Sequence, residues 1–316
     1  MKKTLFVILV TVTSPAAFAW GPIGHRVVAE TAALLVLDHH PTTWGPLLAR
    51  HRFELGVYAF LPDASFRHND GAGGKVEGPT HFRNLDALVG GTATDGTVDR
   101  RIAQFLQLAQ EQLKDVRAPK GDYLRGAVAQ GEARRIFLGL YNLGVMAHYS
   151  GDASMPYHAT ADFNGYARGE GGIHFYFEND CVNALTPGLD ADVLAVARQN
   201  RKCWPRAFKA DAHRPAQLVT AVLEDSLKSV SAVSELDRRY AVTKLQTPGS
   251  TQSAQRKPAA EGCRPMRPLI VERLALGAVL TAALWETVLP AEVDFSAAAG
   301  LQFSDMEFGA AYVPPN

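Results

Sequence analysis

The chain has 316 residues, of which 47% are hydrophobic and 20% charged, and its 32 basic residues balance 32 acidic ones. This balance provides no surplus of Lys and Arg for a polyanion surface. It argues only weakly against a nucleic-acid partner, because a local basic patch needs no net charge. A chain of this length can bury a large core, as one domain or, less readily, as two.

Residues 1–19 have the features of a secretory signal peptide. Two lysines are followed by an apolar stretch, Leu5 to Val12, that is too short to span a bilayer, and Ala17-Phe18-Ala19 matches an A-x-A cleavage site. Cleavage there would make Trp20 the first residue and would leave 30 basic against 32 acidic residues. We therefore expect a mature protein, residues 20–316, that is secreted or periplasmic.

The long apolar segments of the mature chain have helical periodicity. Helices are predicted, in chain order, over residues 24–37, 98–116, 131–149, 187–201, 215–233 and 268–289. Pro lies at or near the start of the last three. No segment alternates convincingly with a period of two, so the prediction is an all-α fold in one domain without a substantial sheet.

Three stretches are predicted to be irregular. Residues 68–79 are rich in Gly, and residues 247–265 are rich in Pro, Ser, Gln and Ala and are expected to be mobile. The segment after Pro290 also lacks a regular pattern. The longest apolar stretch, Leu269 to Leu289, is interrupted by three charged side chains, so no transmembrane helix is expected in the mature chain.

The chain has three cysteines, Cys181, Cys203 and Cys263. An export compartment permits disulfides, and an odd number leaves at most one bond within the chain and one free thiol. None of them belongs to a C-x2-C pair, which argues against a thiolate zinc site. The pairing stays open; proximity in sequence alone favours Cys181 with Cys203.

The stretch from His148 to His158 has the residue types and spacing of a metal site. His148 and Asp152 are four residues apart, which places both on one face of a helix. Pro156 should end that helix and turn His158 back toward it. An aspartate between two histidines is well placed to bridge two cations. A core histidine with an aspartate at the helix end would explain the same residues, so this stretch alone does not decide.

Further candidate ligands are each weak alone. His174 and Glu178 repeat the i, i+4 spacing, whereas Asp63 could be a turn residue and His25 a surface residue. A free α-amino group on Trp20 would titrate near pH ~8, so a zinc ion could displace its proton. The signal is the ordered set: Trp20, His25, Asp63, His81, His148, Asp152, His158, His174 and Glu178.

In this order, the motifs resemble those of the zinc-dependent phospholipase C / S1-P1 nuclease superfamily, from about Trp20 to Asn183. The resemblance implies a mostly α-helical protein that holds three zinc ions in a cleft. Carried over residue by residue, it implies one ion on Asp63, His81, His148 and Asp152. It implies a second ion on His25, the amine and carbonyl of Trp20, and Asp152 as a bridge, and a third on His158, His174 and Glu178.

The resemblance is divided between two branches. The short spacing from Trp20 to His25 is like that of the nucleases. The motif from His148 to Ala159, the short connection to His174 and the pair Glu178-Asn179 are similar to the phospholipases. The choline-pocket residues of the small phospholipases have no clear counterpart here, so the preferred head group stays open.

Both branches imply a hydrolase that cleaves phosphodiesters with a metal-activated hydroxide, and Asp63 could orient or deprotonate the water. The first hypothesis is a phospholipase C that acts on glycerophospholipids. The phospholipid or membrane surface would be the substrate. Aromatic residues that could meet lipid, unless they belong to the core, are Phe66, Tyr157, Phe163, Tyr166 and Phe175.

The alternative hypothesis is a nuclease for single-stranded nucleic acid, or a 3′-nucleotidase. Phe82 would then stack a base, and Asn84 or Asp86 would read its edge. A third hypothesis is a secreted binding protein that keeps its metals for structure only. No protein partner is inferred from the sequence, and a monomer is expected.

Overall fold

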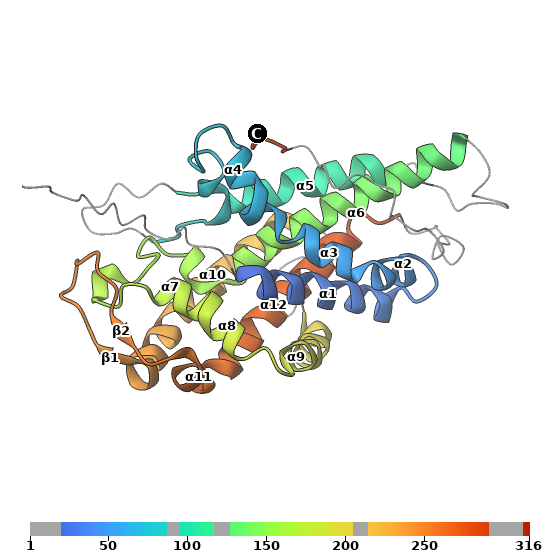
Figure 1. Cartoon of the computed structure of the whole chain (residues 1–316). Helices are drawn as coiled ribbons and strands as arrows, with labels where there is room; N and C mark the ends of the chain where they lie inside the picture. Colours follow the sequence, from blue (N-terminus) through green and yellow to red (C-terminus); the bar gives the residue numbers. More distant parts are fainter. Residues whose placement is uncertain (1–19, 87–94, 115, 117–126, 205–213, 291–311) are drawn as a thin grey trace, which may run out of the picture.

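The computed structural model of the chain describes residues 20–86, 95–114, 116, 127–204, 214–290 and 312–316, and this part is mostly helical (Figure 1). The expected signal peptide lies outside the described residues. Of the segment after Pro290, residues 312–316 are described and contain no helix or strand. The all-α prediction is confirmed for the described part of the chain.

The six predicted helices are present, with shifted ends. They are α1 (Gly21–His39), α5 (Val98–Leu113), α6 (Ala127–Ser154), α9 (Leu189–Cys203), α10 (Pro215–Leu236) and α12 (Arg267–Glu286). Sequence reasoning missed α2 (Trp44–Arg50) and α3 (Arg52–Tyr58). Each has seven residues, about two turns, which is too short for an apolar periodicity to stand out.

Short helical turns connect the long helices and supply several of the candidate ligands. They are η1 (Pro62–Phe66), α4 (Arg67–Asn69), η2 (Gly78–His81), η3 (Pro156–His158), η4 (Tyr166–Arg168), α7 (Ile173–Phe175), η5 (Tyr176–Asp180), α8 (Cys181–Ala184), η7 (Asp237–Ala241), α11 (Ala259–Gly262) and η8 (Arg264–Met266).

The core forms where α12 packs against α1, α6, α9 and α10. Residues Arg264–Glu286 form one helix that is long and apolar enough to cross a membrane, but 83% of its most apolar window is buried inside the protein. Trp285 donates a hydrogen bond from Nε1 to the carbonyl of Leu143 on α6 (3.1 Å). A helix that is apolar on all sides needs burial on all sides, and here other helices provide it.

The disulfide joins Cys181 to Cys263, and Cys203 is a free, exposed thiol. The pairing favoured by sequence proximity, Cys181 with Cys203, is therefore wrong. Cys203 ends α9, whose 15 residues span about 22 Å. Cys263 directly follows α11, which packs against α8, where Cys181 is the first residue. A disulfide persists in oxidising compartments, in agreement with the expected export.

The prediction of an irregular segment over residues 247–265 is confirmed for residues 247–254, which contain no helix or strand, and is wrong for most of the rest. This segment contains α11 and strand β2 (Gln255–Arg256), which pairs antiparallel with β1 (Val242–Lys244). The hairpin lies beside the loop that leads into α7, at one end of the molecule (left in Figure 1). Backbone hydrogen bonds join the two, including Gln246 N–H to Gly169 O (2.9 Å). Composition does not reveal such long-range bonds, because they depend on the partner loop.

Candidate metal centre

The predicted side-chain ligands come from several separate elements and converge in the interior. His25 lies on α1, Asp63 in η1, His81 at the end of η2, and His148 and Asp152 on α6; His158, His174 and Glu178 lie in η3, α7 and η5. All eight side chains belong to residues that are at most 5% exposed. Burial of so many ionisable groups is costly unless they are paired or bind a cation.

Asp152 lies at the centre of the cluster. Its Oδ2 is 3.1 Å from His81 Nδ1 and 3.3 Å from His148 Nε2. Its Oδ1 is 3.6 Å from His25 Nε2 and 3.7 Å from His158 Nδ1. The two oxygens of one carboxylate therefore face different imidazoles, as a bridging ligand would require.

Asp63, in η1, contributes a second carboxylate to the same part of the cluster. Its Oδ1 is 3.8 Å from His81 Nδ1 and 4.0 Å from His148 Nε2, and its Oδ2 is 3.9 Å from His25 Nε2. Two overlapping groups could each hold an ion: His25 with Asp63 and His148, and His81 with His148 and Asp152.

A third group lies on the other side of Asp152. His174 Nε2 is 2.9 Å from both His158 Nε2 and Glu178 Oε2. His158 Nδ1 donates to the carbonyl of His81 (2.6 Å), which leaves its Nε2 with a lone pair directed at His174. Two imidazole nitrogens in such close contact need a proton or a cation between them, so this group also suits a metal ion.

Local chain geometry explains how His158 and His174 meet. The α6 helix ends at Ser154, and Pro156 begins the turn that carries His158, as predicted. Gly172 precedes α7 with a φ of 85°, a left-handed conformation that favours Gly, and an added Cβ would lie 3.0 Å from Ser253 Oγ. This sharp entry into α7 lets His174 return to His158.

The Trp20 side chain is fully buried beside the first two groups. Its Nε1 donates to the carbonyl of Gly151, the residue before Asp152 (2.8 Å). The absence of a side chain at Gly24 provides the space for Trp20, since an added Cβ would lie 2.8 Å from the Trp20 Cβ. Trp20 is the one non-Gly residue with positive φ (28°) among the described residues, a conformation that costs energy within a continuous chain.

The pKa values reflect the burial of the cluster. Burial raises the pKa of Asp63 to about 7 and raises the pKa values of Asp152 and Glu178. Burial lowers the pKa of His148 to about 4 and holds the pKa of His81 well below its ordinary value. At neutral pH these imidazoles are neutral and can act as ligands. The Asp63 carboxyl group is protonated in part of the molecules unless a cation stabilises its charge, and burial shifts the pKa values of Asp152 and Glu178 in the same direction.

Unsatisfied buried oxygens provide an independent test of fit. Oδ2 of Asp63, Oδ1 of Asp152 and Oε1 of Glu178 have no hydrogen-bond partner in the described part of the chain. Buried oxygens without donors are rare in proteins and call for an ion or a water. Imidazole with carboxylate is a donor set that suits zinc. The residues therefore fit a divalent metal centre.

Arg67 is a neighbour of the cluster that sequence reasoning missed. Its Nε lies 3.2 Å from Asp63 Oδ1 and 3.3 Å from His81 Nε2. The contact with His81 directs the opposite nitrogen, Nδ1, toward Asp152. The spacing of four residues between Asp63 and Arg67 was the available signal, but it is common on helix surfaces.

A buried polar network supports the ligands from behind. Arg101 Nη2 contacts Glu77 Oε2 at 3.0 Å, and the Tyr149 hydroxyl donates to Glu77. Tyr149 follows the ligand His148 directly in the chain. The centroid of its ring lies 5.4 Å from that of the His81 ring. Such outer contacts restrict the orientation of ligand rings. Glu77 and Arg101 showed no signal in the sequence, since the tertiary fold brings them to Tyr149.

The candidate substrate residues are placed unevenly. Phe82 and Asn84 follow the ligand His81 and are half-buried. The Asp86 carboxylate accepts hydrogen bonds from Thr160 Oγ1 (2.8 Å) and from the backbone N–H of Ala161 (2.7 Å). Asp86 thus holds the loop after His158, a structural role that the sequence did not reveal.

The aromatic residues considered for lipid contact separate into two classes. Phe66 and Tyr157 are 1% and 0% exposed, so the expectation that they meet lipid is wrong. Phe66 instead stacks on Phe105 in the core. Tyr166 and Phe175 are half-buried, whereas Phe163 is 49% exposed.

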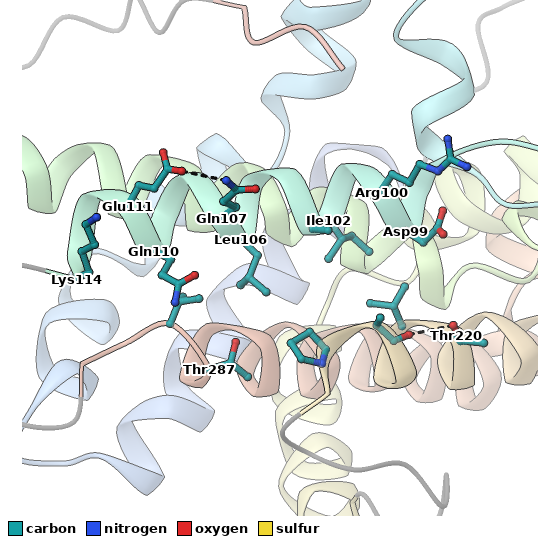
Figure 2. Close-up of a pocket in the computed structure, with 15 residues that line it drawn as sticks. Asp99, Arg100, Ile102, Leu106, Gln107, Gln110, Glu111, Lys114, Thr220 and Thr287 are labelled. Atoms are coloured by element: carbon teal, nitrogen blue, oxygen red, sulfur yellow. Dashed lines mark hydrogen bonds between the residues drawn. The ribbon is translucent and has the colours of Figure 1, made fainter. Parts of the chain in front are cut away.

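A separate groove of about 1000 Å³ lies between α5 and α10. Figure 2 shows Ile102 and Leu106 facing it from α5, with Thr220 on the opposite wall. None of the nine candidate ligands lines this groove, so its size does not make it the reactive site.

Comparisons with known proteins add little to this geometry. No family model and no curated protein matches the chain. Among solved structures, the chain is similar to the alpha-toxin of Clostridium perfringens from the avian strain SWCP, at 13% identity and a TM-score of 0.37. The match covers 86% of this chain and 64% of that one, so the chain spans less than two thirds of its length.

Metal affinity should fall as the pH falls. Without metal, the pKa of Asp63 is about 7, so below pH 7 an ion must displace its proton. We expect the apparent zinc affinity of the Asp63 group to drop about tenfold per pH unit below 7. Chelator competition at pH 7.5 and 6.0, corrected for protonation of the chelator, would measure this. Equal affinities at the two pH values would contradict a protonated carboxyl in the metal-free site.

Proposed function

We propose that this protein is a secreted zinc-dependent phosphodiester hydrolase, and that it acts as a phospholipase C on glycerophospholipids. The observation that supports this best is the position of Asp152, whose Oδ2 faces His81 and His148 while its Oδ1 faces His25 and His158. A carboxylate shared in this way suits closely spaced cations, the arrangement that several hydrolases use on phosphate esters.

Three zinc ions are proposed, with the ligands that the motif resemblance implies. Asp63, His81, His148 and Asp152 would hold one ion, and His158, His174 and Glu178 another. His25, Asp152 and the Trp20 amine and carbonyl would hold the remaining one. Bound zinc would neutralise the charge of a phosphodiester and lower the pKa of water toward ~7.

The protein groups have distinct parts in this chemistry. Asp63 Oδ2 has no donor in the described part of the chain, so it can accept a proton from the attacking water. Arg67 keeps its cationic group within 3.2 Å of Asp63 and can compensate negative charge there. The eight ligand residues are at most 5% exposed, and this low exposure to water strengthens the electrostatic interactions among them.

The N-terminal ligand is proposed from the position of Trp20. Its indole is held by Gly151 next to Asp152, and His25 lies about one turn further along α1. The positive φ of Trp20 would be a cost in a continuous chain. That torsion no longer exists once Trp20 is the first residue, and cleavage would create the amine.

A nuclease acting on single-stranded nucleic acid is the second candidate. Phe82 follows the ligand His81 and is only half-buried, so a base could stack on it. Phosphatidylcholine vesicles and single-stranded DNA, offered side by side to the mature zinc-loaded protein, separate the two. We expect release of a phosphorylated head group, with DNA cleavage at least about tenfold slower. Cleavage of DNA alone would favour the nuclease, and no hydrolysis of either would refute both.

Asp152→Asn should be more damaging than Glu178→Gln. Asp152 is assigned to two ions and Glu178 to one, and loss of a bridge leaves two cations close together without a shared negative charge. We expect lower zinc content in Asp152→Asn and a rate at least about tenfold below that of Glu178→Gln, since changes of even outer groups cost 10–100-fold. Equal zinc content and equal rates in the two variants would contradict the bridge.

An extra residue before Trp20 should weaken the metal centre. A chain that begins Met-Trp20 replaces the terminal amine with an amide nitrogen, which is a poor ligand. We expect a loss of about one zinc ion per chain and a lower turnover, with little change in substrate affinity. Metal analysis and steady-state kinetics would test this, with mass spectrometry to confirm the retained Met. Full zinc content and full rate would rule out the amine ligand.

A further inference from the structure

Several exposed large apolar side chains lie on the loop between His158 and His174 or on segments that are hydrogen-bonded to it. Among the described residues, five are more than a third exposed: Phe53, Val76, Leu85, Phe163 and Leu245. Three of them, Leu85, Phe163 and Leu245, lie on segments that join the loop between His158 and His174. Of the three, Phe163 lies beside the third ligand group, with its ring 6.4 Å from that of His174.

The segment of Leu85 is tied directly to this loop. Leu85 N–H donates to Ala159 O (3.0 Å), and Arg83 N–H donates to His158 O (2.9 Å). The Asp86 carboxylate holds Thr160 and Ala161 by two further hydrogen bonds. Leu85 thus has a fixed position next to the ligand His158.

The β1–β2 hairpin holds the other end of the loop. Besides Gln246, Gly249 donates from its backbone N–H to Tyr166 O (2.8 Å). Arg256 donates from Nη2 to Glu170 O (2.7 Å) and from Nη1 to Gly171 O (2.9 Å). Leu245 precedes Gln246, and the hairpin and loop lie side by side in Figure 1.

Phe163 stands between these two anchors. Its ring packs edge-to-face on Tyr166, with centroids 6.0 Å apart, and lies 6.4 Å from the ring of His174. Half of the side chain nevertheless remains exposed. An aromatic side chain held beside a reactive centre and left in water is a candidate contact for an apolar partner.

We propose that Leu85, Phe163 and Leu245 form a lipid-contacting rim through which the protein docks on a phospholipid surface. This inference rests on the proposed phospholipase function and specifies how its site meets the substrate. Apolar side chains that enter the interface of a bilayer add affinity in proportion to the area they bury. The rim would place the third ligand group next to the head groups.

Two arginines near the exposed apolar side chains are paired with acidic residues, whereas Lys244, next to Leu245, is exposed. Arg83 contacts Asp99 at 4.0 Å, and Arg168 lies 3.3 Å from Asp162 and 3.4 Å from Glu170. These guanidinium groups have acidic partners within the chain, which reduces their value as phosphate-backbone contacts. A zwitterionic lipid surface needs no cationic patch.

The test is the double variant Phe163→Ser/Leu245→Ser, compared with Phe53→Ser as a matched control. Phe53 is 64% exposed but lies on α3, away from the hairpin (Figure 1). We would measure sedimentation of the zinc-loaded proteins with phosphatidylcholine vesicles at 4 °C. We expect partitioning of the double variant to fall about tenfold or more, and Phe53→Ser to behave as wild type.

Hydrolysis provides the second measurement. Rates on vesicles would be compared with rates on monomeric dihexanoylphosphatidylcholine. We expect the vesicle-to-monomer ratio to fall about tenfold in the double variant and to stay constant in Phe53→Ser. Equal vesicle binding by both variants, or a selective loss of DNA hydrolysis in the double variant, would overturn the rim. If the wild-type protein hydrolyses neither vesicles nor monomeric lipid but binds vesicles through these residues, the proposed phospholipase function is refuted, whereas the proposed lipid-contacting rim is supported.

Discussion

The main constraint on this structure is the burial of three carboxyl groups and five imidazoles in one small volume. Desolvation raises the pKa values of Asp63, Asp152 and Glu178, and it lowers those of His81 and His148. Without a cation, this cluster is a substantial cost to folding, since buried polar oxygens lack donors. Bound metal ions would turn that cost into ligand bonds, so metal binding and stability should be coupled.

The helical framework brings these groups together from distant parts of the chain. The end of α6 contributes His148 and Asp152, and α1 packs against α6 and brings His25 to the same place. Trp20 fastens the start of α1 to Gly151. Behind the ligands, the network of Glu77, Arg101 and Tyr149 restricts the rings. In the first two ligand groups, His25, His148 and Asp152 therefore rest on long helices, whereas Asp63 and His81 come from the short turns η1 and η2.

All ligands of the third group lie on short turns, which other segments of the chain hold in place. The hairpin holds the loop before α7. Arg256 of β2 donates a hydrogen bond to the carbonyl of Glu170 in this loop and also pairs with the buried carboxylate of Asp237 (2.8 Å). The disulfide from Cys181 fastens the segment that follows η5. The same loop carries Phe163, so the elements that position His174 also position the proposed rim. Ligand geometry and contact with a lipid surface would then be linked through one piece of backbone.

The sequence by itself determined the long helices and the candidate ligands, because both are local patterns. The i, i+4 pairs His148–Asp152 and His174–Glu178 need only helical geometry. The tertiary structure decided which distant segments meet. It paired Cys181 with Cys263, joined Gly249 and Ala254 to the loop before α7 through backbone hydrogen bonds, buried Phe66 and Tyr157, and left Phe163 exposed. Long-range contacts depend on how whole elements pack, and no spacing within a single segment encodes that packing.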